Sequence, residues 1–461
     1  MRTAGLLLAL GTLVTSTSAS EPVPAALALP AQAARAGPAT TPAAVVARQE
    51  RSTLSFDEAL RRALAANLGL GRARAEVSIA DATRRGALSQ VLPRVTVSGG
   101  LIRNDREVAF GGSDFSVQIL PRNDWNTRVT LSQPIFAGLR EQRAYQQAKE
   151  GVRAAEHGVR ISEDRILLRT ATDYLVVVGG DALARVAEQT LALAQDRLKQ
   201  ARDFFEAGET TRVDVLRAES AVKTAERQLN LARRERETAA GQLRIDLDLD
   251  VVFEVSEPAP PLPERADEAL LVQRAQETRG DVAQARSALR VAELEISKQK
   301  GAYLPTITAD AGYVWQKSAF PADKYGYAAL RFSVPIWQGG EVGARIAVAS
   351  GRQTQARLAL DEALRTAQED VRRALLDLGT AETALSLSQE QLQSAEAEYA
   401  QVFDLYKNQE ATSLDIQSSE ANLADARRAV VVSRIGKLVA ELGVQFAAGD
   451  LKSAVLKEAQ P

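Results

Sequence analysis

Apolar residues recur every seven positions along proline-free stretches of this chain, which is typical of helices that pack along one seam. The clearest seam contains Leu364, Val371, Leu378, Leu385, Leu392, Tyr399 and Tyr406. The stretch 139–207 also has no proline and predicts a helix of roughly 100 Å at 1.5 Å per residue. A single compact core does not need helices of this length, so the pattern predicts a mainly α-helical protein built from paired long helices.

Four other stretches alternate apolar residues with small or polar ones, and this period of two predicts β-strands. The predicted strands cover about 94–110, 115–134, 306–317 and 325–335. Arg128, Asp310 and Arg331 fall on the polar side. One apolar face over about ten residues is typical of a membrane-spanning strand. Four strands cannot close a barrel, so several subunits would have to share one.

Aromatic residues gather in or beside these strands and include all three tryptophans. We interpret them as a membrane-interface girdle made of Trp125, Phe136, Tyr313, Trp315, Tyr325, Tyr327 and Trp337. A soluble sheet with aromatic edges is the alternative.

The same series of signals occurs twice. Pro134 and Pro335 are 201 residues apart, as are Asp214 and Asp415. Such an offset predicts a duplicated unit. In each copy prolines and glycines mark the turns between helix and strand, namely Pro93, Pro134 and Gly138 in the first copy and Pro305, Pro335 and Gly339 in the second.

The duplication organises the chain. Residues 1–20 resemble a secretory signal peptide, and 21–51 form an Ala/Pro-rich segment expected to be disordered. The first repeat spans 52–252, with a long helix 139–207 and a return helix 210–247. A Pro-rich linker, 253–264, leads to the second repeat, 265–447, and a tail, 448–461. The second repeat has the corresponding helices 340–406 and 412–446.

Composition narrows the function. A net charge of -2 argues against a nucleic-acid binder. Without cysteine the chain has no disulfide, thiolate zinc site or thiol for lipid attachment, and its one histidine, His157, cannot form a histidine-ligated metal cluster. No phosphate-binding glycine loop occurs either, so we expect no enzyme, cofactor or metal.

The doubled unit of helix, Leu-Pro, strand hairpin, Pro-Ile-aromatic-x-Gly turn and long helix resembles the TolC family of outer-membrane efflux and secretion proteins, and the likeness covers about 52–447. The resemblance implies a homotrimer with a shared 12-stranded β-barrel in outer-membrane lipid and an α-barrel in the periplasm. It implies an exit duct of a tripartite efflux or type I secretion system. The partners would be a periplasmic adaptor and an inner-membrane transporter of RND, ABC or MFS type.

The helix-turn-helix tips at 205–215 and 406–416 would then form the periplasmic entrance. Asp214 and Asp415 follow the tips and resemble the gate residues of the family, although both are also suited to capping a helix N-terminus. The resemblance assigns adaptor docking to the tip residues Gly208, Thr211, Arg212, Val213, Ala411, Ser413 and Leu414. The chain departs from the family at Gln409, where glycine is usual, and at Ser418, where an acid is usual.

The alternative from another class is a soluble periplasmic coiled-coil adaptor or scaffold. An adaptor would have one long hairpin flanked by compact β-domains, whereas this chain has two hairpins that each follow amphipathic strands.

Overall fold

A computed structural model describes residues 52–112, 115–251, 253–256, 267–318, 322–408 and 410–456, and these belong to one compact unit. The predicted signal peptide and the segment 21–51 lie outside the described residues, as does most of the predicted linker.

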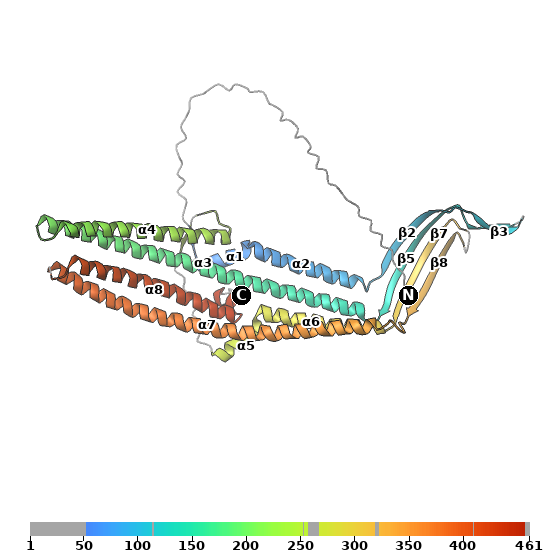
Figure 1. The fold of residues 1–461 in the computed structure, drawn as a ribbon. Coiled ribbons are helices and arrows are strands. Elements are labelled where there is room, and N and C mark those ends of the chain that lie inside the picture. Colours follow the sequence, from blue (N-terminus) through green and yellow to red (C-terminus); the bar gives the residue numbers. More distant parts are fainter. Residues whose placement is uncertain are drawn as a thin grey trace, which may run out of the picture. The chain divides into compact units, whose positions relative to one another are not determined.

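Two long helices of 67 residues, α3 (Arg140–Glu206) and α7 (Glu341–Lys407), dominate the structure. Each turns back at a tight tip into a shorter helix, α4 (Arg212–Leu247) or α8 (Ser413–Ala447). The remaining length of the long helices packs against α2 (Leu68–Ser89) and α6 (Gly280–Lys300). Figure 1 shows the tips of both hairpins at the end opposite the strands. The predicted mainly α-helical fold with a β part is therefore confirmed.

Short elements complete the helical part. They are α1 (Phe56–Ala66), α5 (Glu268–Thr278), the 3-10 helix η1 (Gly301–Tyr303), α9 (Leu451–Val455) and the parallel pair of strands β1 (Ser52–Leu54) and β6 (Phe253–Val255). Within the described part of the chain, no helix is both long enough and apolar enough to cross a lipid bilayer.

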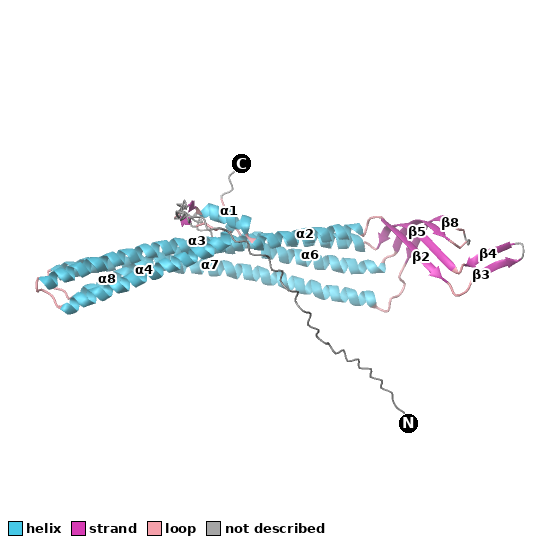
Figure 2. Ribbon diagram, turned by 90° about the horizontal axis from the view of Figure 1, so that it is seen from above, coloured by secondary structure: helices cyan, strands magenta, loops and turns pink. Residues whose placement is uncertain are grey.

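The main sheet has four antiparallel strands in the order β2-β5-β7-β8. Figure 1 labels all four, and Figure 2 shows the strands at one end of the helices. Their bounds are β2 (Arg94–Arg103), β5 (Asn123–Ala137), β7 (Thr306–Gln316) and β8 (Lys324–Ser333). The central pair β5–β7 joins the first copy to the second. Both outer strands, β2 and β8, have one edge without a strand partner among the described residues.

The strands predicted at 94–110 and 115–134 are each broken in two, which corrects the prediction. Beyond β2 and β5 the chain forms a separate two-stranded sheet of β3 (Val108–Gly112) and β4 (Phe115–Leu120). The break has a local cause. Pro121 has no N–H for a ladder, and Asn104 instead closes the gap with its side chain on the Pro121 carbonyl at 2.7 Å.

The helices share a common core only in their middle. There one cluster combines α1, α3, α4, α8 and α9, and its fully buried members include Leu60, Tyr174, Leu243 and Leu451. The Tyr174 hydroxyl lies 2.9 Å from the carbonyl oxygen of Leu54 and 2.7 Å from that of Ser256, so it ties β1 and the end of β6 to α3.

Toward the tips the two hairpins have separate cores. The first consists of Leu191, Ala194, Leu198, Val222 and Ala225, and the second of Leu392, Ala395, Tyr399, Leu423 and Ala426. Each core joins only the two helices of its own hairpin, as the seven-residue seams require.

Candidate functional site

The first tip is a tight turn that depends on glycine. α3 ends at Glu206, and Gly208 adopts a left-handed backbone with φ of +78°. The Glu209 N–H donates to the carbonyl of Phe204 at 2.8 Å, and the Gly208 N–H donates to that of Phe205 at 3.0 Å. These bonds satisfy the last carbonyls of the helix, as in a Schellman motif. Space around Gly208 is open, so backbone conformation, not crowding, is what favours glycine here.

Both return helices begin with the same capping box. In α4 the Thr211 hydroxyl donates to the Asp214 carboxylate at 2.7 Å, and in α8 the Thr412 hydroxyl donates to Asp415 at 2.6 Å. The backbone N–H of the capping threonine also donates to that aspartate, at 3.3 Å in the first tip and 2.8 Å in the second. Both aspartates predicted as gate residues therefore also cap helices.

Asp214 does more than cap its own helix. Its second carboxylate oxygen accepts a hydrogen bond from the Ser413 hydroxyl of the other tip, and Arg217 lies 3.5 Å from the same oxygen. The hydrogen bonds from Ser413 and Thr211 hold the pKa of Asp214 well below its usual range. Asp415 is exposed, and its pKa is lowered by the bonds from Thr412 alone. The structure thus joins Asp214 and Ser413, which the sequence predicted separately.

The other tip residues predicted to dock an adaptor sit on or near the surface. Thr211 and Arg212 are exposed at the start of α4, and Ala411 is half-buried just before α8. Two large apolar side chains are open to solvent, with Val213 53% exposed and Leu414 61% exposed. Phe205 of the first tip is also 45% exposed, so apolar side chains at both tips are open to solvent.

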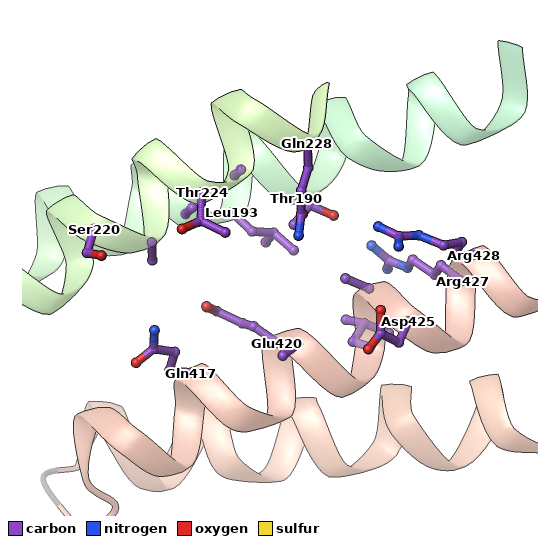
Figure 3. A pocket seen from close by; sticks show the side chains of 16 residues that line it. Thr190, Leu193, Ser220, Thr224, Gln228, Gln417, Glu420, Asp425, Arg427 and Arg428 are labelled. Atoms are coloured by element: carbon purple, nitrogen blue, oxygen red, sulfur yellow. The ribbon is translucent and has the colours of Figure 1, made fainter. Parts of the chain in front are cut away.

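A cavity of about 240 Å³ lies between the two hairpins above the tips. Figure 3 shows Gln417 and Glu420 pointing into it from α8, opposite Leu193 and Thr224. The two hairpin cores do not merge at this level. Individual contacts join the hairpins instead, such as the Phe204–Tyr406 ring pair with 6.1 Å between centroids.

The main polar contact beside this cavity is a buried ion pair that sequence reasoning missed. Arg197 of α3 lies 2.9 Å from Glu420 of α8, and their side chains are 8% and 15% exposed. The guanidinium also stacks over the ring of Tyr406 with 5.2 Å to its centroid. Burial raises the pKa of Glu420 to about 7, and Arg197 offsets only part of this effect. The signal was available, since Arg197 lies between the core positions Ala194 and Ala201 of its helix, where a charge needs a buried partner.

At the opposite end of the helices, the register gives the sheet one apolar and one polar face. Trp125, Phe136, Tyr313 and Trp315 lie on the apolar face, together with exposed side chains such as Val97 (68%) and Phe332 (75%). Trp337 follows the end of β8 and is 86% exposed.

Tyr325 and Tyr327 do not belong to that apolar set. Tyr325 pairs with Val314, and Tyr327 pairs with Gly312 and lies 3.5 Å from the Thr130 hydroxyl. Both face the side that carries Asp310 and Arg331, because directly paired residues share a face. Their assignment to a lipid-facing girdle is therefore corrected. The alternation along 325–335 already places both tyrosines on the side of Arg331, and the girdle assignment followed residue type instead.

The turns between strands and long helices also depend on left-handed glycines. Gly138 has a φ of +66° and Gly339 one of +60°. Pro93 and Pro305 stand immediately before β2 and β7, Pro134 lies at a register shift in β5, and Pro335 follows β8. No group of three or more His, Asp or Glu side chains in the described ranges is arranged to hold a metal ion.

Comparisons with known proteins agree with this architecture. The chain is 25% identical over 400 residues to the outer membrane efflux protein BepC of Brucella suis, covering 85% of this chain and 84% of that protein. The solved structure of CusC matches with a TM-score of 0.75 at 19% identity, covering 87% of this chain and 94% of that one. The outer membrane protein VceC of Vibrio cholerae matches with a TM-score of 0.71 at 16% identity, covering 86% and 96%. Both structural matches show the shared fold.

The sequence profile described as "Outer membrane efflux protein" matches residues 59–245 and 271–450, which are the two copies of the repeat. The resemblance and the outer-membrane location inferred from the sequence are thereby confirmed. This chain belongs to the outer membrane efflux protein family.

Proposed function

We propose that three copies of this chain form the exit duct of a tripartite efflux or type I secretion system. The observation that carries the proposal is the four-stranded sheet with an apolar face and two unpaired outer edges, β2 and β8. Backbone groups at an open edge cannot be satisfied in lipid. Pairing of β8 with β2 of the next subunit removes both edges, and three copies give a closed sheet of twelve strands. Family membership favours this duct over a soluble adaptor.

The tips would form the periplasmic entrance of this duct. The Asp214–Ser413 bond holds the two tips of one protomer together, while Asp415 is exposed and ionised. In a trimer, Asp415 supplies a ring of three carboxylates that favours cations. Opening requires the tips to separate, so the cross-tip bond would stabilise the closed state.

The duct would work with a periplasmic adaptor and an inner-membrane transporter of RND, ABC or MFS type. The exposed Val213 and Leu414 at the tips are suited to contact the adaptor, because burial of each apolar side chain on docking is favourable by about 1–3 kcal/mol. The energy for export would come from the transporter.

Disulfide trapping tests the trimer, and the absence of native cysteine gives it a clean background. Thr96→Cys on β2 combined with Ala329→Cys on β8 should give oxidation-dependent dimers and trimers on denaturing gels. Thr96→Cys with Thr130→Cys is the matched control, since these residues pair within one protomer and should give only an intrachain bond. Neighbouring positions on β8 are scanned to allow for register. A protein that stays monomeric in detergent at every position would overturn the proposal.

Planar bilayer recordings test the entrance. Asp214→Ala combined with Asp415→Ala should raise single-channel conductance and weaken cation preference. Ser413→Ala alone should raise conductance without changing the charge. Unchanged conductance and selectivity in both would leave these aspartates with a capping role only.

A further inference from the structure

The polar face of the sheet carries an excess of positive charge. Its ionisable side chains are three arginines and two aspartates, namely Arg94, Arg128, Arg331, Asp124 and Asp310. One net positive charge per protomer remains. The position of the arginine without a carboxylate partner determines where this face can bind an anion.

One arginine is already neutralised. Arg331 lies 3.3 Å from Asp310, whose side chain is only 8% exposed. Arg128, in contrast, is exposed and has no carboxylate within ion-pair distance among the described strands. Its direct partners in the register are Ser98 and Val314. Asp124 is four residues along the same strand, or roughly 13 Å away at 3.3 Å per residue, so it does not pair with Arg128.

Aromatic hydroxyl groups flank Arg128 at the same level. Tyr325 pairs with Val314, which in turn pairs with Arg128, so the three residues form one row across β5, β7 and β8. Val314 is 2% exposed although it belongs to the open polar face. Its register partners on the same face are the two long side chains of Arg128 on β5 and Tyr325 on β8.

The next row is arranged in the same way. Gly312 has no side chain, and a Cβ atom there would lie 2.7 Å from the ring of Tyr327. The ring therefore lies across β7, with its hydroxyl 3.5 Å from that of Thr130. The Tyr327 ring thus lies across β7 one row from Arg128, and Tyr325 stands in the same row as Arg128.

From this arrangement we propose that Arg128, together with Tyr325 and Tyr327, is a binding site for organic anions on the inner wall of the duct. The inference rests on the proposed trimeric duct, which turns the polar face inward and repeats the site three times. The planar guanidinium binds a carboxylate or sulfonate in bidentate fashion, and the phenol rings contact the aromatic or apolar body of the anion. Organic anions that have passed the entrance would be held briefly at this level of the duct. The expected affinity is weak, since cargo must also leave.

The test uses the purified full-length trimer in planar bilayers, with benzene-1,3,5-tricarboxylate added on the side of the strands. Asp214→Ala/Asp415→Ala serves as the background, so that the entrance does not limit the current. Wild-type Arg128 should give reversible block at a concentration about ten-fold lower than Arg128→Gln does, since loss of one charge-assisted bidentate contact corresponds to roughly that factor. Arg128→Lys, which keeps the charge but not the fork, should fall between them.

Two controls make the outcome specific. Arg103→Gln removes the same charge from the other face of the same sheet, so its block should equal that of wild type. Benzene-1,3,5-trimethanol, the uncharged counterpart of the probe, should block none of the variants. Equal block of wild type and Arg128→Gln by the tricarboxylate would overturn the site while leaving the duct intact. Absence of any channel would instead count against the duct itself.

Discussion

The two copies of the repeat pass from strand to long helix through the same kind of turn, yet the surroundings of these turns differ. Gly138 and Gly339 both have left-handed backbones. A Cβ atom on Gly138 would lie 2.1 Å from the carbonyl oxygen of Gly301, whereas nothing lies within 4 Å of one on Gly339. The cause is position in the sheet, because β5 lies between β2 and β7 and β8 is at the edge. The two glycines thus share a local backbone conformation, and their neighbours in space determine whether a side chain would fit there.

The largest effect is expected when each of these two glycines is replaced by alanine in a separate variant. Gly138→Ala should lower the free energy of unfolding by at least about 3 kcal/mol, because it adds overlap with Gly301 to the backbone strain. Gly339→Ala should cost mainly the strain, about 1 kcal/mol, because no atom of its own protomer lies within 4 Å of the added Cβ. Thermal unfolding followed by circular dichroism in detergent gives the comparison. Gly351→Ala, inside α7 with open space, is the control and should not destabilise. Similar losses at both turns would show that the contact with Gly301 is unimportant.

A second test compares two glutamates at equivalent positions, Glu420 in the second copy and Glu219 in the first. Glu420 is buried beside Arg197, whereas Glu219 pairs with Arg202 on the surface at 2.8 Å. The pKa of Glu420 is raised from 4.5 to about 7, so the packed state holds a proton that the separated hairpins release. Stability of the packing is therefore highest below pH 4.5 and falls as the pH rises to 7, by about 3 kcal/mol in total.

Hydrogen exchange of residues 190–200 and 416–428, corrected for the intrinsic rate, measures this pH dependence. Protection should decrease between pH 5 and pH 8 in wild type and in Glu219→Gln. Glu420→Gln should remove most of the decrease, since an amide does not titrate. Persistence of the full decrease in Glu420→Gln would assign it to other groups.

The two tip aspartates give a smaller effect. Asp415→Ala should lower local stability slightly through loss of the capping box. Asp214→Ala should cost more, by about another 1 kcal/mol, because the bond with Ser413 is lost as well. Exchange rates in the first turns of α4 and α8 report both. Ser413→Ala should reproduce only the additional part, and equal effects of the two aspartates would contradict a stabilising cross-tip bond.

The smallest effect is expected one residue after the turn glycines. Leu139 has a φ of +62°, whereas its equivalent in the second copy is Gly340 with a φ of +80°. Leu139→Gly should stabilise the protein by up to about 1 kcal/mol, since glycine adopts this backbone without strain. Gly340→Leu should destabilise by a similar amount in the same thermal assay. A loss on Leu139→Gly would mean that the half-exposed side chain contributes more by packing than its backbone costs.

These contrasts also show how far the sequence alone reaches. Period and spacing predicted the long helices, the strands and the capping aspartates, because those depend on residues within one or two turns. The Asp214–Ser413 and Arg197–Glu420 contacts join residues about two hundred positions apart, and no seam within a hairpin specifies how the hairpins meet. The pairing of Tyr325 with Val314 and of Tyr327 with Gly312 required the strand register, which spacing within one strand does not give. The break in the first strand hairpin involves a hydrogen bond from the Asn104 side chain to the Pro121 carbonyl, a contact that strand periodicity does not predict.

The pairing of β1 with β6 has a consequence for the order in which the chain can fold. Ser52 is matched with Phe253, and Tyr174 contacts both Leu54 and Ser256, so the beginning of the first copy stays open until its end has been made. The four-stranded sheet depends on an even later part of the chain, because β5 pairs with β7 of the second copy. Without β7, the two-stranded sheet β2–β5 would be only marginally stable in water. Contacts of such long sequence separation form slowly. The first half of this chain therefore cannot complete the four-stranded sheet until the second half is present.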